Sequence, residues 1–148
     1  MDEVLDNPEV RPLPSQLRFV EQGPLGFEHL TSFQLEAYAA DTPFYWLRAV
    51  EDPEVAFLVM EPGLFIDDYA FELSDETLAA LQVSEADEIG VLVLLTVPEN
   101  PLEMTANLLG PLVFHRHQHQ CKQVVLDADT YPLQHPVLQG VLNARIDA

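Results

Sequence analysis

The chain has 148 residues, of which 48% are hydrophobic, and its formal net charge at pH 7 is -19. This length fits one domain, and the apolar share is too high for a disordered chain. The excess of carboxylates argues against direct binding of nucleic acid or of an anionic membrane surface, because like charges repel.

The two ends of the chain differ from the segment between them. Residues 1–15 hold three prolines among charged side chains, which predicts an irregular leader, and residues 138–148 are expected to form a C-terminal tail. The N-terminus lacks the basic and apolar regions of a signal peptide, and the longest apolar run, residues 89–97, is too short to span a bilayer. The single cysteine, Cys121, suits a reducing compartment. We therefore expect a cytoplasmic protein.

The middle segment, residues 16–137, is predicted to be one domain built from short strands. Its apolar runs are bounded by proline, glycine or acidic residues and are rich in β-branched and aromatic side chains, which favours strands over helices. These runs are residues 16–20, 33–37, 44–50, 55–60, 89–97, 108–115 and 123–127. The loop of four residues between the third and fourth runs predicts a hairpin.

Many of these runs are continuously apolar, which is typical of strands that are covered on both faces. In a chain of this size, the pattern predicts an all-β fold: a small, closed or strongly curled β-barrel with one or two short helices. One helix is predicted after Ser74, which can cap its N-terminus, while Asp75 and Glu76 suit the positive end of the helix dipole. A second short helical turn is expected at residues 84–87.

A run of histidines ends in the only cysteine: His115, His117, His119 and Cys121 alternate along the chain. Imidazole and thiolate groups are good zinc ligands. In a straight strand, however, these four residues would span about 20 Å at roughly 3.3 Å per residue, whereas zinc ligands converge to about 2 Å from the metal. The run is therefore either the end of a strand followed by a turn, or a zinc site completed from elsewhere.

The negative charge is concentrated in one stretch. Between Ala49 and His115 the chain has fourteen carboxylates and no Lys or Arg. Such a stretch serves either solubility or the electrostatic attraction of a basic partner. A carboxylate-based hydrolase is a further alternative, but no pair of carboxylates is singled out by the sequence. A Gly-x-Ser-x-Gly motif and a Gly-rich phosphate loop are both missing, so we predict no enzyme activity and no cofactor.

Two aromatic residues, Phe65 and Tyr69, flank the pair Asp67–Asp68 in a segment without strand pattern. Exposed aromatic rings beside charged groups are typical of protein-binding surfaces. These two residues are therefore candidate apolar anchors for a partner, with burial in the core as the alternative.

An ordered set of segments resembles a known family, the bacterial flagellar assembly factor FliW. In chain order the matching segments are residues 23–28 (GPLGFE), 43–44 (PF), 47–53 (LRAVEDP), 56–57 with Pro62, 68–69 (DY), 95–98 (LTVP), 105–108 (TANL), 110–112 (GPL), 122–124 (KQV), Tyr131 and 135–136 (HP). The resemblance extends over residues 16–137. Each short match is unspecific, and the order and spacing of the whole set carry the resemblance.

The resemblance implies a small β-barrel without enzymatic activity and with two protein partners. One is the C-terminal region of flagellin. The other is CsrA, a small basic RNA-binding repressor of translation that the family prevents from repressing flagellin messenger RNA. A protein with a charge of -19 suits a basic partner. We therefore expect a protein that is monomeric when free and that antagonises CsrA.

The candidate partner-binding residues are the loop carboxylates and the two aromatic residues. They are Glu51, Asp52, Phe65, Asp67, Asp68, Tyr69, Glu99 and Glu103. Two alternatives stay open beside the hydrolase: an acidic chaperone for another basic or secreted protein, and a regulatory zinc site at the histidine run.

Overall fold

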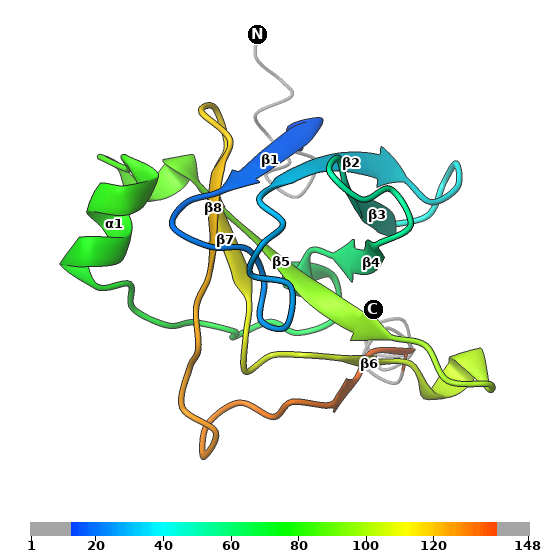
Figure 1. Ribbon diagram of the computed structural model, residues 1–148. Coiled ribbons are helices and arrows are strands. Elements are labelled where there is room, and N and C mark those ends of the chain that lie inside the picture. The colour runs from blue at the N-terminus through cyan, green and yellow to red at the C-terminus, as the bar shows by residue number, and fades with distance from the viewer. Residues whose placement is uncertain (1–12, 139–148) are drawn as a thin grey trace, which may run out of the picture.

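The computed structural model describes residues 13–138, and it is dominated by short strands (Figure 1). The expectations for residues 1–12 and 139–148 lie outside the described residues. The strands are β1 (Gln16–Phe19), β2 (Ser32–Ala37), β3 (Tyr45–Ala49), β4 (Ala56–Met60), β5 (Ile89–Thr96), β6 (Thr105–Ala106), β7 (Leu112–His115), β8 (Gln120–Gln123) and β9 (His135–Pro136). The helices are α1 (Asp75–Leu81) and the short 3-10 turns η3 (Pro62–Leu64), η4 (Ala86–Glu88) and η5 (Pro101–Glu103).

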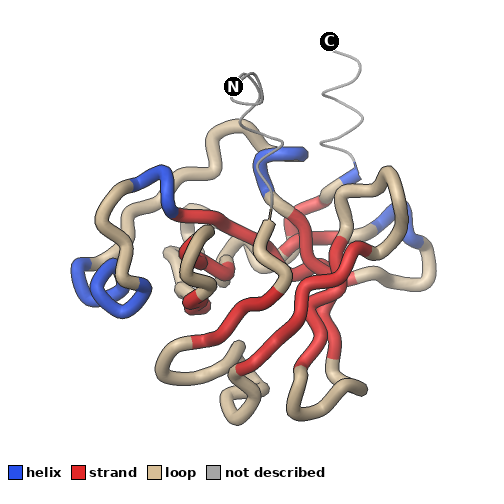
Figure 2. Tube along the Cα trace, turned by 90° about the horizontal axis from the view of Figure 1, so that it is seen from above, coloured by secondary structure: helices blue, strands red, loops and turns tan. Residues whose placement is uncertain are grey.

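Seven of these strands close into a barrel in the order β4-β3-β2-β1-β8-β7-β5, and β4 pairs with β5 to complete the ring. All of these pairs are antiparallel except the parallel pair of β1 with β8. Strands β6 and β9 extend the sheet beyond β5. Figure 2 shows the strands gathered at the centre, with loops and short helices around them. The expectation of a small, closed or strongly curled β-barrel with short helices is confirmed, and the ring is closed.

Alternating side chains from the strands fill the barrel interior. Phe33 and Leu35 of β2 point inward and are buried, whereas Gln34 between them is exposed. Strand β5 places Gly90 directly opposite Phe114 of β7, and the aromatic ring occupies the space that the Cβ of any other residue at position 90 would take. This contact explains why a glycine stands in a strand interior, where it is otherwise unfavourable.

A second, smaller core lies on the outer face of β4 and β5. Met60 and Val93 point away from the barrel interior and are buried under irregular segments that contribute Phe65, Leu108 and Val137. Strand β5 is therefore covered on both faces along this part of its length, as its continuous apolar sequence predicts.

The strand prediction fails on both sides of Pro111, at an Asn107 turn and at the missing proline N–H. The predicted strand over residues 108–115 begins only at Leu112, because Asn107 Oδ1 accepts the N–H groups of Leu109 and Gly110 in a turn. The predicted strand over residues 123–127 is wrong, since β8 ends at Gln123. Val124 still donates to the carbonyl of Pro111 (3.0 Å), but proline has no N–H with which to return a ladder bond.

Candidate functional site

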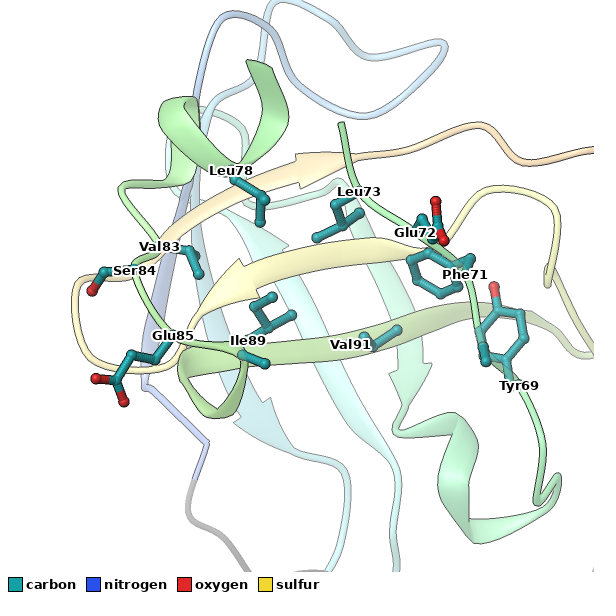
Figure 3. A pocket seen from close by; sticks show the side chains of 12 residues that line it. Tyr69, Phe71, Glu72, Leu73, Leu78, Val83, Ser84, Glu85, Ile89 and Val91 are labelled. Atoms are coloured by element: carbon teal, nitrogen blue, oxygen red, sulfur yellow. The ribbon is translucent and has the colours of Figure 1, made fainter. Parts of the chain in front are cut away.

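An apolar groove of about 550 Å³ lies on the outside of the barrel beside α1 (Figure 3). Its floor consists of Ile89 and Val91, two residues of β5 on the face opposite the barrel interior. Leu78 of α1 forms part of one wall, and Leu73 from the segment before the helix lies across from the floor. In Figure 3 the side chains of Leu73, Leu78 and Ile89 point into the same space.

The groove stays open because α1 is short. The helix has seven residues and packs against β8, and its buried side chains are Thr77 and Leu81. Two helical turns are about 10 Å long, and the strand that α1 packs against is β8. The outer face of β5 at Ile89 and Val91 is therefore only partly covered.

Local capping holds α1 in place, as the sequence predicts. The backbone N–H of Thr77 donates to Ser74 Oγ (3.1 Å), and the helix ends at Gln82 in the left-handed region at φ 61°. The following turn is fixed by Glu88, because its Oε1 accepts the N–H groups of Ser84 (2.9 Å) and Glu85 (3.0 Å). These hydrogen bonds, from Ser84 first and then Glu85, hold the Glu88 pKa below its usual range.

Two tyrosines hold the opposite wall of the groove. The Tyr69 hydroxyl donates to the carbonyl of Leu108 (2.6 Å), and the Tyr131 hydroxyl donates to the carbonyl of Ala70 (2.7 Å) and accepts its N–H (3.1 Å). The two rings meet edge to face at 4.8 Å. Burial raises the pKa of the Tyr69 phenol. The wall is therefore ordered before any ligand binds.

Two carboxylates lie at the margin of the groove. Glu72 and Glu85 are exposed and belong to its lining, and within the described part of the chain no Lys or Arg does. A smaller groove of about 200 Å³ shares Ile89 and Val91 with it and ends at Arg116, whose guanidinium lies 3.7 Å from Glu61. The larger groove therefore suits a partner that is apolar and positively charged.

The predicted site residues Glu51 and Asp52 lie in the hairpin loop between β3 and β4 and are exposed. The carboxylate of Glu51 braces this loop, because it accepts hydrogen bonds from Thr31 Oγ1 (3.3 Å) and from the Ser32 N–H (3.3 Å). Its own backbone N–H first, and then the N–H groups of Ser32 and Thr31, lower the Glu51 pKa. Glu51 thus has a structural role that the sequence did not reveal.

The segment from Phe65 to Tyr69 contains two predicted carboxylates and both predicted aromatic anchors, and these residues differ in exposure. Asp67 and Asp68 are exposed. Phe65 is only 7% exposed and packs in the smaller core against His135, so it has the core position that the sequence left open as the alternative. It is buried because the outward faces of β4 and β5 need an apolar cover. Tyr69 is partly buried and belongs to the groove lining.

Glu99 and Glu103 are exposed and lie after β5, around η5. Between them Leu102 is 74% exposed. The antiparallel register of β4 with β5 brings the end of β5 beside the start of β4. Glu99 therefore lies toward the same end of this strand pair as Asp52, whereas Asp67 and Asp68 follow the other end of β4.

The histidine run is the end of a strand followed by a turn, with β7 ending at His115 and β8 starting at Gln120. His115 is 1% exposed, and its Nδ1 accepts the N–H groups of His117 (3.0 Å) and Gln118 (3.1 Å). Among residues 13–138 no group of three or more His, Cys, Asp or Glu residues is placed to hold a metal ion. Cys121 is buried in the barrel interior, and burial raises the pKa of its thiol.

No pattern in the sequence predicted the groove. Its floor belongs to a continuously apolar run, and which residues of that run point outward depends on the register of β5 with β7. A usable signal was the shortness of the predicted helix after Ser74 relative to the strands it has to cover.

No helix within residues 13–138 is long and apolar enough to cross a membrane.

Comparison with known proteins points to one family. A family described as "FliW protein" matches residues 8–138. Proteins described as "Flagellar assembly factor FliW" are 34% identical in Thermoanaerobacter pseudethanolicus, covering 91% of both chains, and 35% identical in Caldanaerobacter subterraneus, covering 85% of both. A crystal structure of the flagellar assembly factor FliW is 34% identical, with a TM-score of 0.76 over 83% of this chain and 85% of that one.

Proposed function

This chain belongs to the FliW family of flagellar assembly factors, and from that premise we propose that it is a non-enzymatic binding protein. Its partners are the translational repressor CsrA, which it antagonises, and the C-terminal region of flagellin. In this way it couples flagellin translation to flagellum assembly. It acts in the cytoplasm, is a monomer when free, and needs no cofactor.

The observation that supports the CsrA proposal is the exposed negative charge. Asp52, Asp67, Asp68 and Glu99 are exposed on loops, and Glu103 is exposed at the end of η5. Three of the described cations instead lie against carboxylates: Arg48 with Glu36, Arg116 with Glu61 and Lys122 with Glu21. An acidic surface of this kind attracts a basic RNA-binding protein and repels RNA.

Titration calorimetry with purified CsrA, at low and at moderate salt, tests this proposal. We expect binding that weakens as salt rises, because screening reduces attraction between exposed charges. The double variant Asp67→Asn/Asp68→Asn is expected to bind more weakly than Asp41→Asn/Asp129→Asn, which removes the same charge from two exposed turns away from the candidate residues. No binding at low salt would refute the CsrA proposal.

The flagellin proposal and the chaperone alternative are separated by a gel-shift competition. Adding the protein to a CsrA–RNA complex should release the RNA, and adding a flagellin C-terminal fragment should restore the complex. An acidic chaperone for another basic or secreted client would bind that client and leave the RNA complex intact.

The hydrolase alternative requires a carboxylic acid with a raised pKa beside a second carboxylate. The carboxyl pKa shifts found in the described residues, at Glu28, Glu51 and Glu88, are all downward. Each is caused first by hydrogen bonds from backbone N–H groups. This pattern favours the binding function over catalysis.

A further inference from the structure

We propose that the groove beside α1 binds the apolar face of an amphipathic helix that carries Lys or Arg along its margins. The proposal rests on the proposed function, in that the chain acts by binding proteins. It adds a surface distinct from the loop carboxylates and specifies the chemistry of its occupant.

The groove offers an apolar floor and apolar walls of a suitable size. Ile89, Val91, Leu73, Leu78 and Val83 converge on it in Figure 3, and its volume is about 550 Å³. Side chains of an amphipathic helix at positions i, i+3, i+4 and i+7 fill grooves of this kind. The smaller groove that shares Ile89 and Val91 continues the surface past Pro62 and Leu64 to Arg116, which is paired with Glu61.

The backbone around the groove favours a partner that is recognised through its side chains. A peptide that adds a strand needs an unpaired sheet edge. The floor of the groove is paired with β7, and β5 pairs with β4 beyond the floor, at Val93 and Leu94. In the wall, the N–H and C=O groups of Ala70 are both bonded to the Tyr131 hydroxyl. A helix, which is recognised through its side chains, fits this surface.

The charge around the groove determines what flanks the apolar residues of the partner. Glu72 and Glu85 lie on its border, Figure 3 shows the Glu85 carboxylate directed away from the floor, and no described Lys or Arg belongs to the lining. The lining comes from residues 69–91, inside the stretch between Ala49 and His115 that has no Lys or Arg at all. Carboxylates at the margin favour Lys or Arg on the partner and disfavour acidic helices.

The walls are ordered in advance, which lowers the entropic cost of binding. Tyr69 and Tyr131 fix one side, while the Ser74 cap and the Glu88 hydrogen bonds fix the other. A helix that docks here therefore meets a surface that needs little rearrangement.

The test uses the full chain and two synthetic peptides, with binding followed by fluorescence anisotropy. One peptide has leucines at i, i+3, i+4 and i+7 and lysines on both margins, and the second has glutamates in place of the lysines. We expect the lysine peptide to bind at least about tenfold more tightly than the glutamate peptide, a ratio equal to about 1.4 kcal/mol.

Variants of the groove floor test the location. Val91→Lys should weaken binding of the lysine peptide at least about tenfold through lost apolar contact and charge repulsion, and the isosteric Val91→Thr should weaken it about threefold. The matched control is Val125→Lys, because Val125 is 63% exposed and lies outside the groove. Circular dichroism melts verify that each variant is folded. If Val91→Lys does not fold, Val91→Thr still tests the location.

Three results would overturn the inference: equal binding of both peptides, the same loss of affinity in Val125→Lys as in the Val91 variants, or no loss in Val91→Thr. Calorimetry with CsrA separates this failure from failure of the proposed function. If wild type binds CsrA but the peptide results are negative, only the groove proposal falls. If peptides bind in the groove and CsrA does not bind, the CsrA proposal falls alone.

Discussion

The interior and the exterior of the barrel are sealed to different degrees. Inside, seven strands close into a ring, and Leu47, Leu92 and Phe114 are 0% exposed. Outside, the cover consists of the short helix α1 and irregular segments, and Ile89 and Val91 remain partly exposed.

The difference shows where this fold can carry function. A closed ring has no unpaired strand edge that a partner could use. A substitution in the barrel interior is therefore expected to change stability before it changes binding. Around the groove, beside the smaller core, the outer layer is held by caps and side-chain hydrogen bonds, each worth about 1 kcal/mol, so this part can be altered without loss of the barrel. Four predictions test this contrast, in order of decreasing effect.

The largest effect is expected for Phe114→Ala in the barrel interior. Loss of a fully buried ring should lower the free energy of unfolding by about 3–5 kcal/mol through lost burial and a cavity beside Gly90. Urea denaturation measures this value. Leu78→Ala in the groove wall is the matched outer variant, and it should cost less because Leu78 is only partly buried. Equal losses at the two positions would contradict the contrast.

A smaller effect is expected at buried His115, which holds the turn between β7 and β8. His115→Leu removes the Nδ1 acceptor of the His117 and Gln118 N–H groups and should lower the free energy of unfolding by about 1–3 kcal/mol. His115→Asn places an oxygen near the position of Nδ1 and should recover part of the loss. Urea denaturation measures this value as well. A stability of His115→Leu equal to that of wild type would contradict the expected contribution of these bonds to folding.

The helix cap should contribute less again. Ser74→Ala removes the acceptor of the Thr77 N–H and should lower the free energy of unfolding by about 1 kcal/mol. Ser74→Asn keeps an oxygen that can cap and serves as the control. Hydrogen exchange at α1 should rise in Ser74→Ala and not in the barrel strands. A uniform rise across the chain would mean that α1 and the barrel open together.

The smallest effect concerns pH. The pKa of Glu88 is lower in the folded chain than the ordinary value near 4.3, so the charged form stabilises the folded state. This contribution is fully present above the unfolded pKa and is lost as pH falls through the lower folded value. The stability difference between wild type and Glu88→Gln should therefore be present at pH 7 and shrink below about pH 4. Glu99→Gln on an exposed loop is the control, and an identical pH profile for both variants would contradict the assignment.

Much of the fold could be predicted from local patterns. The apolar runs at residues 44–50 and 55–60 predict β3, β4 and their hairpin because close strands pair through a short loop. Ser74 predicts the start of α1 because a capping oxygen acts within one turn. The strand predicted at residues 123–127 is wrong because the missing N–H of Pro111, on the neighbouring segment, affects the pairing of those residues.

The site was less predictable, because burial depends on what lies across the fold. Phe65 and Tyr69 have similar sequence surroundings, yet Phe65 covers the outer face of β4 and β5 while Tyr69 helps to line the groove. Glu51 and Asp52 are neighbours in one loop, yet the Glu51 carboxylate is bonded to Thr31 and Ser32. These assignments require the strand register, which no local pattern contains.

The sequence by itself determined the β-rich class, the capped helix, the concentration of negative charge and the resemblance to the FliW family, because these depend on residues near one another or on their order. Only the tertiary structure decided between a closed and a strongly curled sheet, the parallel pairing of β1 with β8 and the opening beside α1. The physical reason is that the groove is the part of the outer face of β5 that a seven-residue helix cannot cover. Its existence depends on the distance between elements that are remote in the chain.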